Sequence, residues 1–133
     1  AKFALPELLK TKGSMINTAS VSGLGGDWGA AFYCASKGAV VNLTRAMALD
    51  HGGDGVRINA VCPSLVKTNM TNGWPQDIRD KFNERIALGR AAEPEEIASV
   101  VTFLASDDAS FINGVNLPVD GGATASDGQP KIV

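Results

Sequence analysis

Short apolar segments alternate with longer amphipathic ones along this chain, and the alternation restricts its fold more than any other feature. Three runs, at 14–19, 57–62 and 115–119, are rich in apolar residues and bounded by turn signals, which predicts buried strands. Helical patterns separate these runs. Strands that alternate with helices of about ten residues or more indicate a parallel sheet covered on both faces. The sequence therefore predicts an α/β fold with a doubly wound parallel sheet.

The helical segments carry recognisable start and stop signals. The longest covers 32–50 and ends before Gly52 and Gly53, and its apolar residues recur at helical spacing: Val40, Leu43 and Met47. Another begins at Pro94, with two glutamates favourable to the helix dipole in its first turn and four core-facing residues: Ile97, Val100, Val101 and Leu104. A third pattern follows the polar segment 63–75 and predicts a helix that acts as a lid, with apolar positions at Ile78, Phe82 and Ile86.

Charge, hydropathy and cysteine spacing narrow the possible partners. The formal net charge is −2 and the isoelectric point is near 5.3, so we expect neither nucleic acid nor an anionic membrane surface as partner. No apolar run reaches the roughly 20 residues of a membrane span and the chain opens without a signal-peptide pattern, which favours a cytoplasmic location. Cys34 and Cys62 lack metal-ligand or redox spacing, so we expect two reduced, buried thiols and no metal site.

Tyr33 and Lys37 are the first candidates for chemistry. They lie four residues apart in one predicted helix, so their side chains share a face, with Cβ atoms roughly 5–6 Å apart. An unperturbed tyrosine loses its proton near pH 10, and acid/base use near pH 7 requires about 4 kcal/mol of help. An ammonium group about 4 Å away supplies about that much at an effective dielectric near 20. The pair therefore predicts a tyrosine acid/base assisted by a lysine.

Ser20 follows the first predicted strand and stands 13 positions before Tyr33. Four glycines lie between them, so the backbone there can fold tightly and approach a ligand closely. Pro63 and Ser64 follow the second predicted strand. Because ligands bind outside the carboxyl ends of parallel strands, we expect Ser20, Pro63 and Ser64 to converge on the start of the helix that carries Tyr33.

The order of these motifs resembles the short-chain dehydrogenase/reductase family. The similarity covers nearly the whole chain and rests on segments 17–20, 33–38 with its Tyr-x-x-x-Lys pattern, 57–63, 88–90, 94–97, 103–106 and 116–122. The resemblance implies an NAD(P)-dependent oxidoreductase. In that family's scheme Tyr33 is the general acid/base, Lys37 binds the nicotinamide ribose and assists Tyr33, and Ser20 hydrogen-bonds the substrate oxygen.

The resemblance also implies a cofactor loop. Residues 63–68 are similar to the family's Pro-Gly-x-Val-x-Thr loop, in which the Val backbone and the Thr hydroxyl hold the nicotinamide carboxamide. The expected cofactor contacts are therefore Tyr33, Lys37, Pro63, Ser64, Val66 and Thr68. Ser64 stands where the family usually has glycine, a departure that can shift this loop.

Two family features have no counterpart in the sequence. The glycine-rich phosphate loop is absent, because segment 23–28 lacks a glycine at position 28, and the Asn that precedes Ser20 in the family's catalytic set is absent too. The chain also opens within a helical pattern at 3–10. We therefore expect residues 1–133 to be the C-terminal, catalytic half of one Rossmann-type domain, completed by the N-terminal half of the same protein.

Within the family, segments 23–28, 37–45 and 126–130 are most similar to acetoin/diacetyl reductases, also called 2,3-butanediol dehydrogenases. This likeness implies a small carbonyl or secondary alcohol as substrate, NAD as cofactor with NADP not excluded, and a homotetramer. The substrate is expected to meet Ser20, Val21, Val66, Trp74 and Gln129, the last from a neighbouring subunit. Val21 and Val66 are equally well read as core residues, and Trp28 and Trp74 more readily as packing residues at the mouth of the site.

Two other functions stay open at this point. A 3-oxoacyl-(acyl carrier protein) reductase or another short-chain alcohol dehydrogenase would use the same fold and residues, because a fold does not fix its substrate. The alternative from another class is a non-catalytic scaffold or binding fragment. Cofactor binding would distinguish that fragment from an enzyme.

Overall fold

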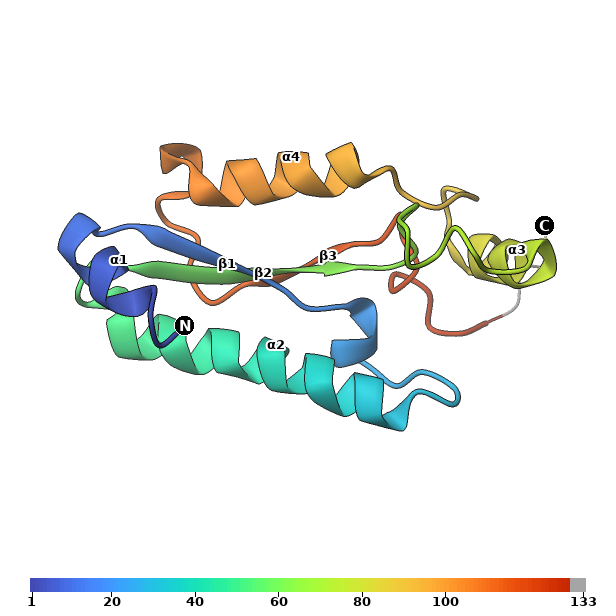
Figure 1. The fold of residues 1–133 in the computed structure, drawn as a ribbon, viewed down its shortest axis with the longest axis horizontal. Coiled ribbons are helices and arrows are strands. Elements are labelled where there is room, and N and C mark those ends of the chain that lie inside the picture. Colours follow the sequence, from blue (N-terminus) through green and yellow to red (C-terminus); the bar gives the residue numbers. More distant parts are fainter. Residues whose placement is uncertain (130–133) are drawn as a thin grey trace.

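A parallel sheet between two helical layers forms the body of the computed structural model, which describes residues 1–129 (Figure 1). Its strands are β1 (Ser14–Thr18), β2 (Arg57–Pro63) and β3 (Asn116–Val119), in the spatial order β1-β2-β3. Both neighbouring pairs are parallel. The three predicted strands and the parallel α/β architecture are thus confirmed.

Helices cover both faces of this sheet. In Figure 1, α1 (Leu5–Thr11) and α2 (Ala31–Gly52) lie below it and α4 (Pro94–Ala105) lies above it. The helix α3 (Gln76–Arg85) lies beyond the carboxyl ends of the strands, and two short 3-10 helices, η1 (Val21–Gly23) and η2 (Asp107–Ala109), follow β1 and α4. No helix within residues 1–129 combines the length and apolar character needed to cross a bilayer.

The central strand β2 supplies side chains to both faces of the sheet. Ile58, Ala60 and Cys62 pack on the α2 side and Val61 packs under α4, all with no exposed surface. Fully burying an isoleucine or valine contributes about 1.5–3 kcal/mol, so this strand is the main source of hydrophobic stabilisation. Because β2 lies between the other two strands, the carboxyl ends of β1 and β3 lie on either side of it.

The buried face of α2 differs from the predicted one. Leu43 is 49% exposed, whereas Val41 and Thr44 are buried against the sheet. Thr44 is tolerated there because its hydroxyl donates to the Val40 carbonyl (2.8 Å) and accepts from the Asn17 amide (2.9 Å). The apolar spacing predicted a helix correctly and Met47 is buried, but the buried face is centred between the predicted positions and those that follow them, at Val41, Thr44 and Ala48.

Two asparagines fix β3 beside β2. Asn59 is fully buried, and its side chain donates to the Ile112 carbonyl (2.8 Å) and accepts from the Val115 N–H (3.0 Å). Asn113 accepts from the Ile58 N–H (2.8 Å) and donates to the Ala48 carbonyl (3.0 Å). Because these two amides satisfy backbone groups on both sides, they hold the loop before β3 in one position.

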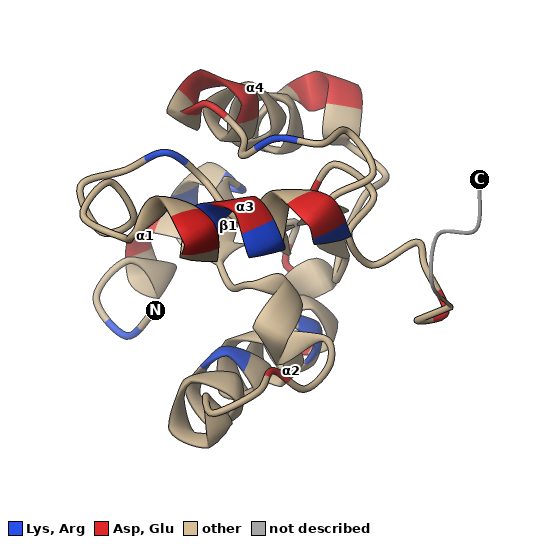
Figure 2. Cartoon of the chain, turned by 90° about the vertical axis from the view of Figure 1, so that its right-hand side faces the viewer, with Lys and Arg blue, Asp and Glu red and all other residues tan. Residues whose placement is uncertain are grey.

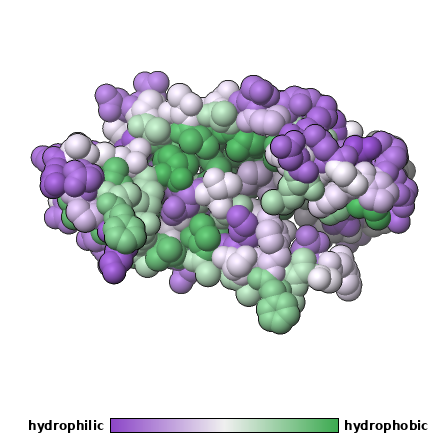
Figure 3. Space-filling model, in the orientation of Figure 1, coloured by the Kyte–Doolittle hydropathy of each residue, from purple (hydrophilic) through white to green (hydrophobic). Residues whose placement is uncertain are grey.

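The helix α4 begins at Pro94, as predicted, and its four predicted core residues pack around Val61. Glu93 and Glu96 form a capping box at its start, and Glu96 also pairs with Arg90 at 2.7 Å. The hydrogen bond from Arg90 lowers the pKa of Glu96 to about 2. Figure 3 shows the apolar surface gathered between α4 and the sheet.

The predicted lid helix is α3, but it ends at Arg85, so Ile86 follows the helix in extended backbone and is buried beside Leu65 and Ala91. Figure 2 shows acidic and basic residues intermixed along α3. Cys62 is buried as expected, whereas Cys34 is only half-buried near the start of α2. Burial raises the pKa of the Cys62 thiol, which keeps it protonated near neutral pH.

Candidate active site

Ser20 lies just beyond the carboxyl end of β1, where the chain turns into η1. It is buried, and its Oγ accepts a hydrogen bond from the Ser22 N–H at 3.2 Å, so the serine caps the 3-10 turn. Since Oγ accepts in that contact, its own O–H hydrogen stays available for donation. The turn thus fixes the serine oxygen and leaves one donor for a ligand.

Tyr33 and Lys37 lie on the first turns of α2, against the same edge of the sheet. The Lys37 Nζ donates to the Thr18 carbonyl at 3.1 Å and lies 5.8 Å from the centre of the Tyr33 ring. The structure therefore brings Lys37 to the end of β1, two residues before Ser20. Tyr33 is 46% exposed and accessible to a ligand.

Gly23 explains how η1 can pack so closely on α2. A Cβ at this position would lie 2.6 Å from both the carbonyl carbon and oxygen of Lys37, closer than real side chains approach. The Gly23 N–H also donates to the Ser20 carbonyl at 2.9 Å. The predicted close approach of the glycine-containing loop is thus a contact between η1 and the backbone of Lys37.

The loop after β2 is held by hydrogen bonds within the chain. Pro63 ends β2, and the Ser64 hydroxyl donates to the Asp120 carbonyl at 3.0 Å, which ties this loop to the end of β3. The Thr71 hydroxyl donates to the Val66 carbonyl (2.6 Å) and accepts from the Thr68 N–H (3.0 Å). The segment predicted to bind the cofactor is therefore held in a defined turn by its own hydrogen bonds.

A nicotinamide cofactor fits the donors that remain in this region. Lys37 has three N–H groups and uses one of them on Thr18, so two remain for ribose hydroxyls. Among residues 1–129, the Val66 N–H has no acceptor and the Thr68 side chain is exposed, so both can reach a carboxamide. The region thus retains unused N–H and hydroxyl donors, the kind of group that a ribose and a carboxamide require.

Asp120 is a site-supporting residue that the sequence reading did not single out. Its partial burial opposes ionisation, but hydrogen bonds from the Thr124 hydroxyl (2.6 Å), the Thr124 N–H (2.8 Å) and the Gly122 N–H (2.9 Å) outweigh it. The pKa of the Asp120 carboxyl is consequently lowered. The signal in the sequence was Asp followed by two glycines and a threonine, a composition typical of a carboxylate-capped turn.

The structure places the predicted substrate residues less closely together. Val21 is half-buried in η1 and Val66 is half-buried in the loop after β2, and Trp74 packs on Phe82 with ring centres 5.2 Å apart. Trp28 is 100% exposed, so its interpretation as a packing residue is wrong. It lies on a loop with little to pack against. Gln129 is exposed in the segment after Gly128, and its substrate contact stays a prediction.

Comparisons with known proteins found a matching family model and similar sequences. A family model described as enoyl-(acyl carrier protein) reductase matches residues 1–124. Meso-2,3-butanediol dehydrogenase of Serratia marcescens is 89% identical over 133 residues, which are 100% of this chain and 53% of that protein. A 3-oxoacyl-[acyl-carrier-protein] reductase of Thermotoga maritima is 39% identical over 122 residues, 91% of this chain and 50% of that enzyme.

A solved structure supports the same assignment of fold. The structure of 4-hydroxyisoleucine dehydrogenase complexed with NADH matches with a TM-score of 0.88 at 32% identity, and the match covers 95% of this chain and 54% of that one. The chain therefore spans about half the length of the relatives that it matches.

Proposed function

Because the chain belongs to the short-chain dehydrogenase/reductase family, we propose that its protein is an NAD-dependent dehydrogenase that interconverts 2,3-butanediol and acetoin, or acetoin and diacetyl. The 89% identity to meso-2,3-butanediol dehydrogenase over the whole chain carries this proposal. The positions of Ser20 just after β1 and of Tyr33 and Lys37 near the start of α2, with Lys37 hydrogen-bonded to Thr18, also support it, because these side chains provide what a carbonyl/alcohol reaction needs.

In the proposed reaction, Ser20 and Tyr33 bind the reacting oxygen. The Ser20 hydroxyl donates to it, since the serine oxygen already accepts from Ser22. In the oxidation direction the Tyr33 phenolate takes the hydroxyl proton while the carbinol C–H bond breaks, and in reduction Tyr33 returns that proton. Bound NAD supplies the acceptor or donor of the hydride. Lys37 adds a positive charge near Tyr33 and donates to the cofactor ribose.

The proposed cofactor contacts divide between backbone and side chains. Val66 N–H and the Thr68 hydroxyl bind the carboxamide, and Pro63 shapes the start of the loop. Ser64 has a different role from the other proposed cofactor residues, because its hydroxyl already donates to the Asp120 carbonyl. We assign it the task of fixing the loop. The preference for NAD is supported by similarity to proteins that include an NADH-complexed dehydrogenase.

The substrate pocket in this proposal includes Val21, Val66 and Trp74, with Gln129 contributed by a neighbouring subunit of a cytoplasmic homotetramer. Exposed apolar side chains on α2, Phe32 and Leu49, support burial of this helix in an assembly. A Gln129→Ala change in the full-length protein should raise the Michaelis constant for acetoin. Unchanged Michaelis constants for every substrate would remove Gln129 from the pocket.

A second candidate is a 3-oxoacyl-(acyl carrier protein) reductase. The 39% identical relative from Thermotoga maritima and the description of the matching family model favour it. It would use the same three residues on a larger, thioester-linked substrate. The substrate preference of the full-length protein separates the two candidates.

The deciding experiment compares the full-length protein with its Tyr33→Phe variant on acetoin, diacetyl, 2,3-butanediol and an acetoacetyl thioester. We expect the small substrates to be preferred, and Tyr33→Phe to lower kcat by about 100-fold or more with cofactor binding nearly unchanged. Ser110→Ala, which removes an exposed hydroxyl outside the proposed site, is the control and should keep its activity. Preference for the thioester would select the second candidate, and an active Tyr33→Phe variant would refute the mechanism.

A further inference from the structure

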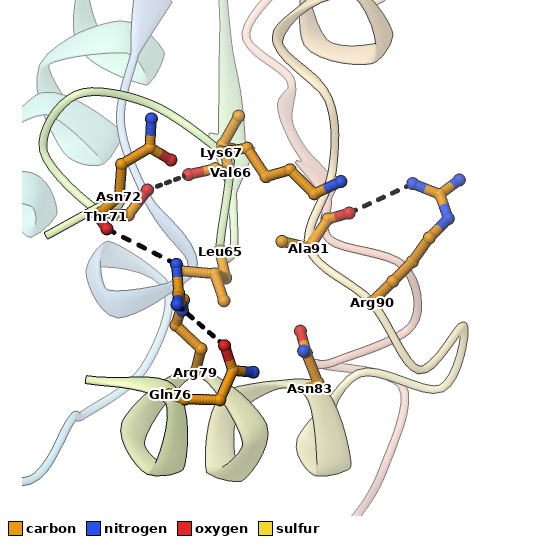
Figure 4. Close-up of a pocket in the computed structure, with 10 residues that line it drawn as sticks. All are labelled: Leu65, Val66, Lys67, Thr71, Asn72, Gln76, Arg79, Asn83, Arg90 and Ala91. Carbon is orange, nitrogen blue, oxygen red and sulfur yellow. Dashed lines mark hydrogen bonds between the residues drawn. The ribbon is translucent and has the colours of Figure 1, made fainter. Parts of the chain in front are cut away.

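A cavity of about 240 Å³ lies between the loop 65–72, helix α3 and residues 90–91 (Figure 4). Val66, a predicted cofactor and substrate residue, is among its lining residues, whereas Ser20, Tyr33 and Lys37 are not. Leu65 and Ala91 form part of an apolar wall. Polar residues line the rest of the cavity: Arg79 and Asn83 from α3, and Lys67 and Arg90 from the segments that carry Leu65 and Ala91. Figure 4 shows that the side chains from α3 point toward the loop, so the two walls face each other.

The charge of the lining favours an anion. No lining residue is acidic, and three are cationic. Lys67 pairs with Glu93 and Arg90 pairs with Glu96, so both of these charges are balanced. Arg79 has no carboxylate partner within residues 1–129; one terminal nitrogen donates to the Gln76 side chain at 2.8 Å and the other lies 3.5 Å from the Asn72 carbonyl. Arg79 is therefore the cation whose charge remains available.

Two buried polar atoms of this wall have no partner. They are the Nε–H donor of Arg79 and the Oδ1 acceptor of Asn83, which lie one helical turn apart on α3. Leaving a buried donor or acceptor unpaired costs about 1–3 kcal/mol, so unpaired buried groups are rare in folded proteins. A ligand that offers an acceptor to Arg79 and a donor to Asn83 removes both costs.

We propose that this cavity binds a small 2-hydroxycarboxylate anion. Its carboxylate accepts from the Arg79 guanidinium, its hydroxyl donates to Asn83 Oδ1, and its short carbon chain contacts Leu65 and Ala91. The cavity volume is below the usual range of pockets for drug-sized ligands, about 300–1,000 Å³, which favours a small ligand. The site shares Val66 with the proposed cofactor and substrate contacts, but it includes none of the side chains proposed for proton transfer, so ligand binding here can be measured apart from dehydrogenase activity.

The experiment titrates the full-length protein with lactate and, separately, with acetate, which lacks the hydroxyl. The readout is the Nε–H signal of Arg79 in ¹H–¹⁵N spectra, because Arg79 lines this cavity and is not among the predicted catalytic, cofactor or substrate residues. We expect lactate to saturate the shift with a Kd of about 1–10 mM and acetate to bind more weakly. Asn83→Ala should weaken lactate binding by about threefold or more and leave acetate binding unchanged.

The matched variants are Arg79→Gln, which removes the charge from the cavity, and Arg85→Gln, which removes an exposed charge from the same helix outside it. Calorimetry should show lactate affinity reduced about tenfold or more by Arg79→Gln and nearly unchanged by Arg85→Gln. No shift of the Arg79 signal at about 50 mM lactate, or equal losses in the two variants, would overturn the proposal. Absence of a shift would mean that the cavity holds only water. Equal losses in the two variants would mean that lactate responds to the net charge of the protein and not to this cavity.

Discussion

Lys37 is attached to the end of β1 by a hydrogen bond from its Nζ to the backbone carbonyl of Thr18, 3.1 Å away. This contact fixes a positive charge beside Ser20 before any ligand arrives. A flexible lysine loses side-chain entropy when it is ordered, and here that cost of up to about 2 kcal/mol is met during folding. The lysine is therefore preorganised for its proposed task.

Replacing Lys37 by Met should remove this charge while keeping a side chain of similar length. We expect kcat of the full-length protein to fall by about 100-fold or more, because the proposed acid/base step loses its electrostatic support. Arg45→Met on the exposed face of the same helix is the control. Steady-state kinetics with acetoin would test this, and equal rates for Lys37→Met and Arg45→Met would contradict it.

Gly23 offers a test of the close packing between η1 and α2. Gly23→Ala places a Cβ 2.6 Å from the Lys37 backbone, so the 3-10 turn or the helix must move. We expect a loss of about 1–3 kcal/mol in the free energy of unfolding and a lower kcat, because Ser20 and Lys37 are displaced together.

Gly26→Ala is the matched control for that change, since a Cβ there meets no atom within 4 Å and the backbone does not adopt a positive φ. It should change stability by less than about 0.5 kcal/mol. Urea unfolding of the two full-length variants measures the difference. If both glycines tolerate alanine equally, the contact does not constrain the site.

The order of strands and helices could be predicted because each apolar run is bounded by its own turn signals. The face of α2 could not be predicted in the same way. Val40, Leu43 and Met47 give the helical period, but the buried position is taken by Thr44, a polar residue whose hydroxyl is satisfied by Val40 and Asn17. Hydropathy alone assigns such a residue to solvent, because the pairing is a tertiary event.

Within the site, the side chains with a family motif could be named from the sequence, whereas their backbone partners could not. The Thr18 carbonyl and the Thr71 hydroxyl take part through geometry that no residue pattern records. For Trp28 the residue type itself was misleading. A large apolar side chain predicts burial, but the Trp28 side chain is fully exposed. A loop of small residues provides no surface to cover it.

Asp120 should make stability depend on pH. Its folded pKa is lowered, so the carboxylate contributes stability that is present above the unfolded value of about 3.9 and is lost as the pH falls through the folded value. Asp120→Asn keeps the size but removes one of the two acceptor oxygens. We expect it to cost about 1–3 kcal/mol at pH 7 and progressively less below about pH 4.

Unfolding of the full-length Asp120→Asn variant at several pH values would measure this difference. Asp50→Asn, at an exposed position near the end of α2, is the control and should change stability by less than about 0.5 kcal/mol. A cost of Asp120→Asn that stays constant between pH 7 and about pH 3 would contradict the role of the ionised carboxylate.

Arg57 holds the carboxyl end of α4 through three hydrogen bonds, from its guanidinium to the carbonyls of Leu104 (2.8 Å), Ser106 (2.9 Å) and Ala105 (3.3 Å). The last carbonyls of a helix have no hydrogen-bond partner within the helix. A positive charge at this end also interacts favourably with the negative end of the helix dipole. Arg57→Met keeps the aliphatic stem but leaves these carbonyls without their donor.

We expect Arg57→Met to lower the free energy of unfolding by about 1–3 kcal/mol and to increase hydrogen exchange in the last turn of α4. Arg57→Lys should recover only part of the loss, because an ammonium group cannot reach three carbonyls in the geometry of a planar guanidinium. Arg85→Met, on the exposed side of α3, controls for the removal of one positive charge. If Arg57→Met and Arg85→Met unfold at the same urea concentration, or if lysine restores full stability, the fork-like contact is not what secures this helix to β2.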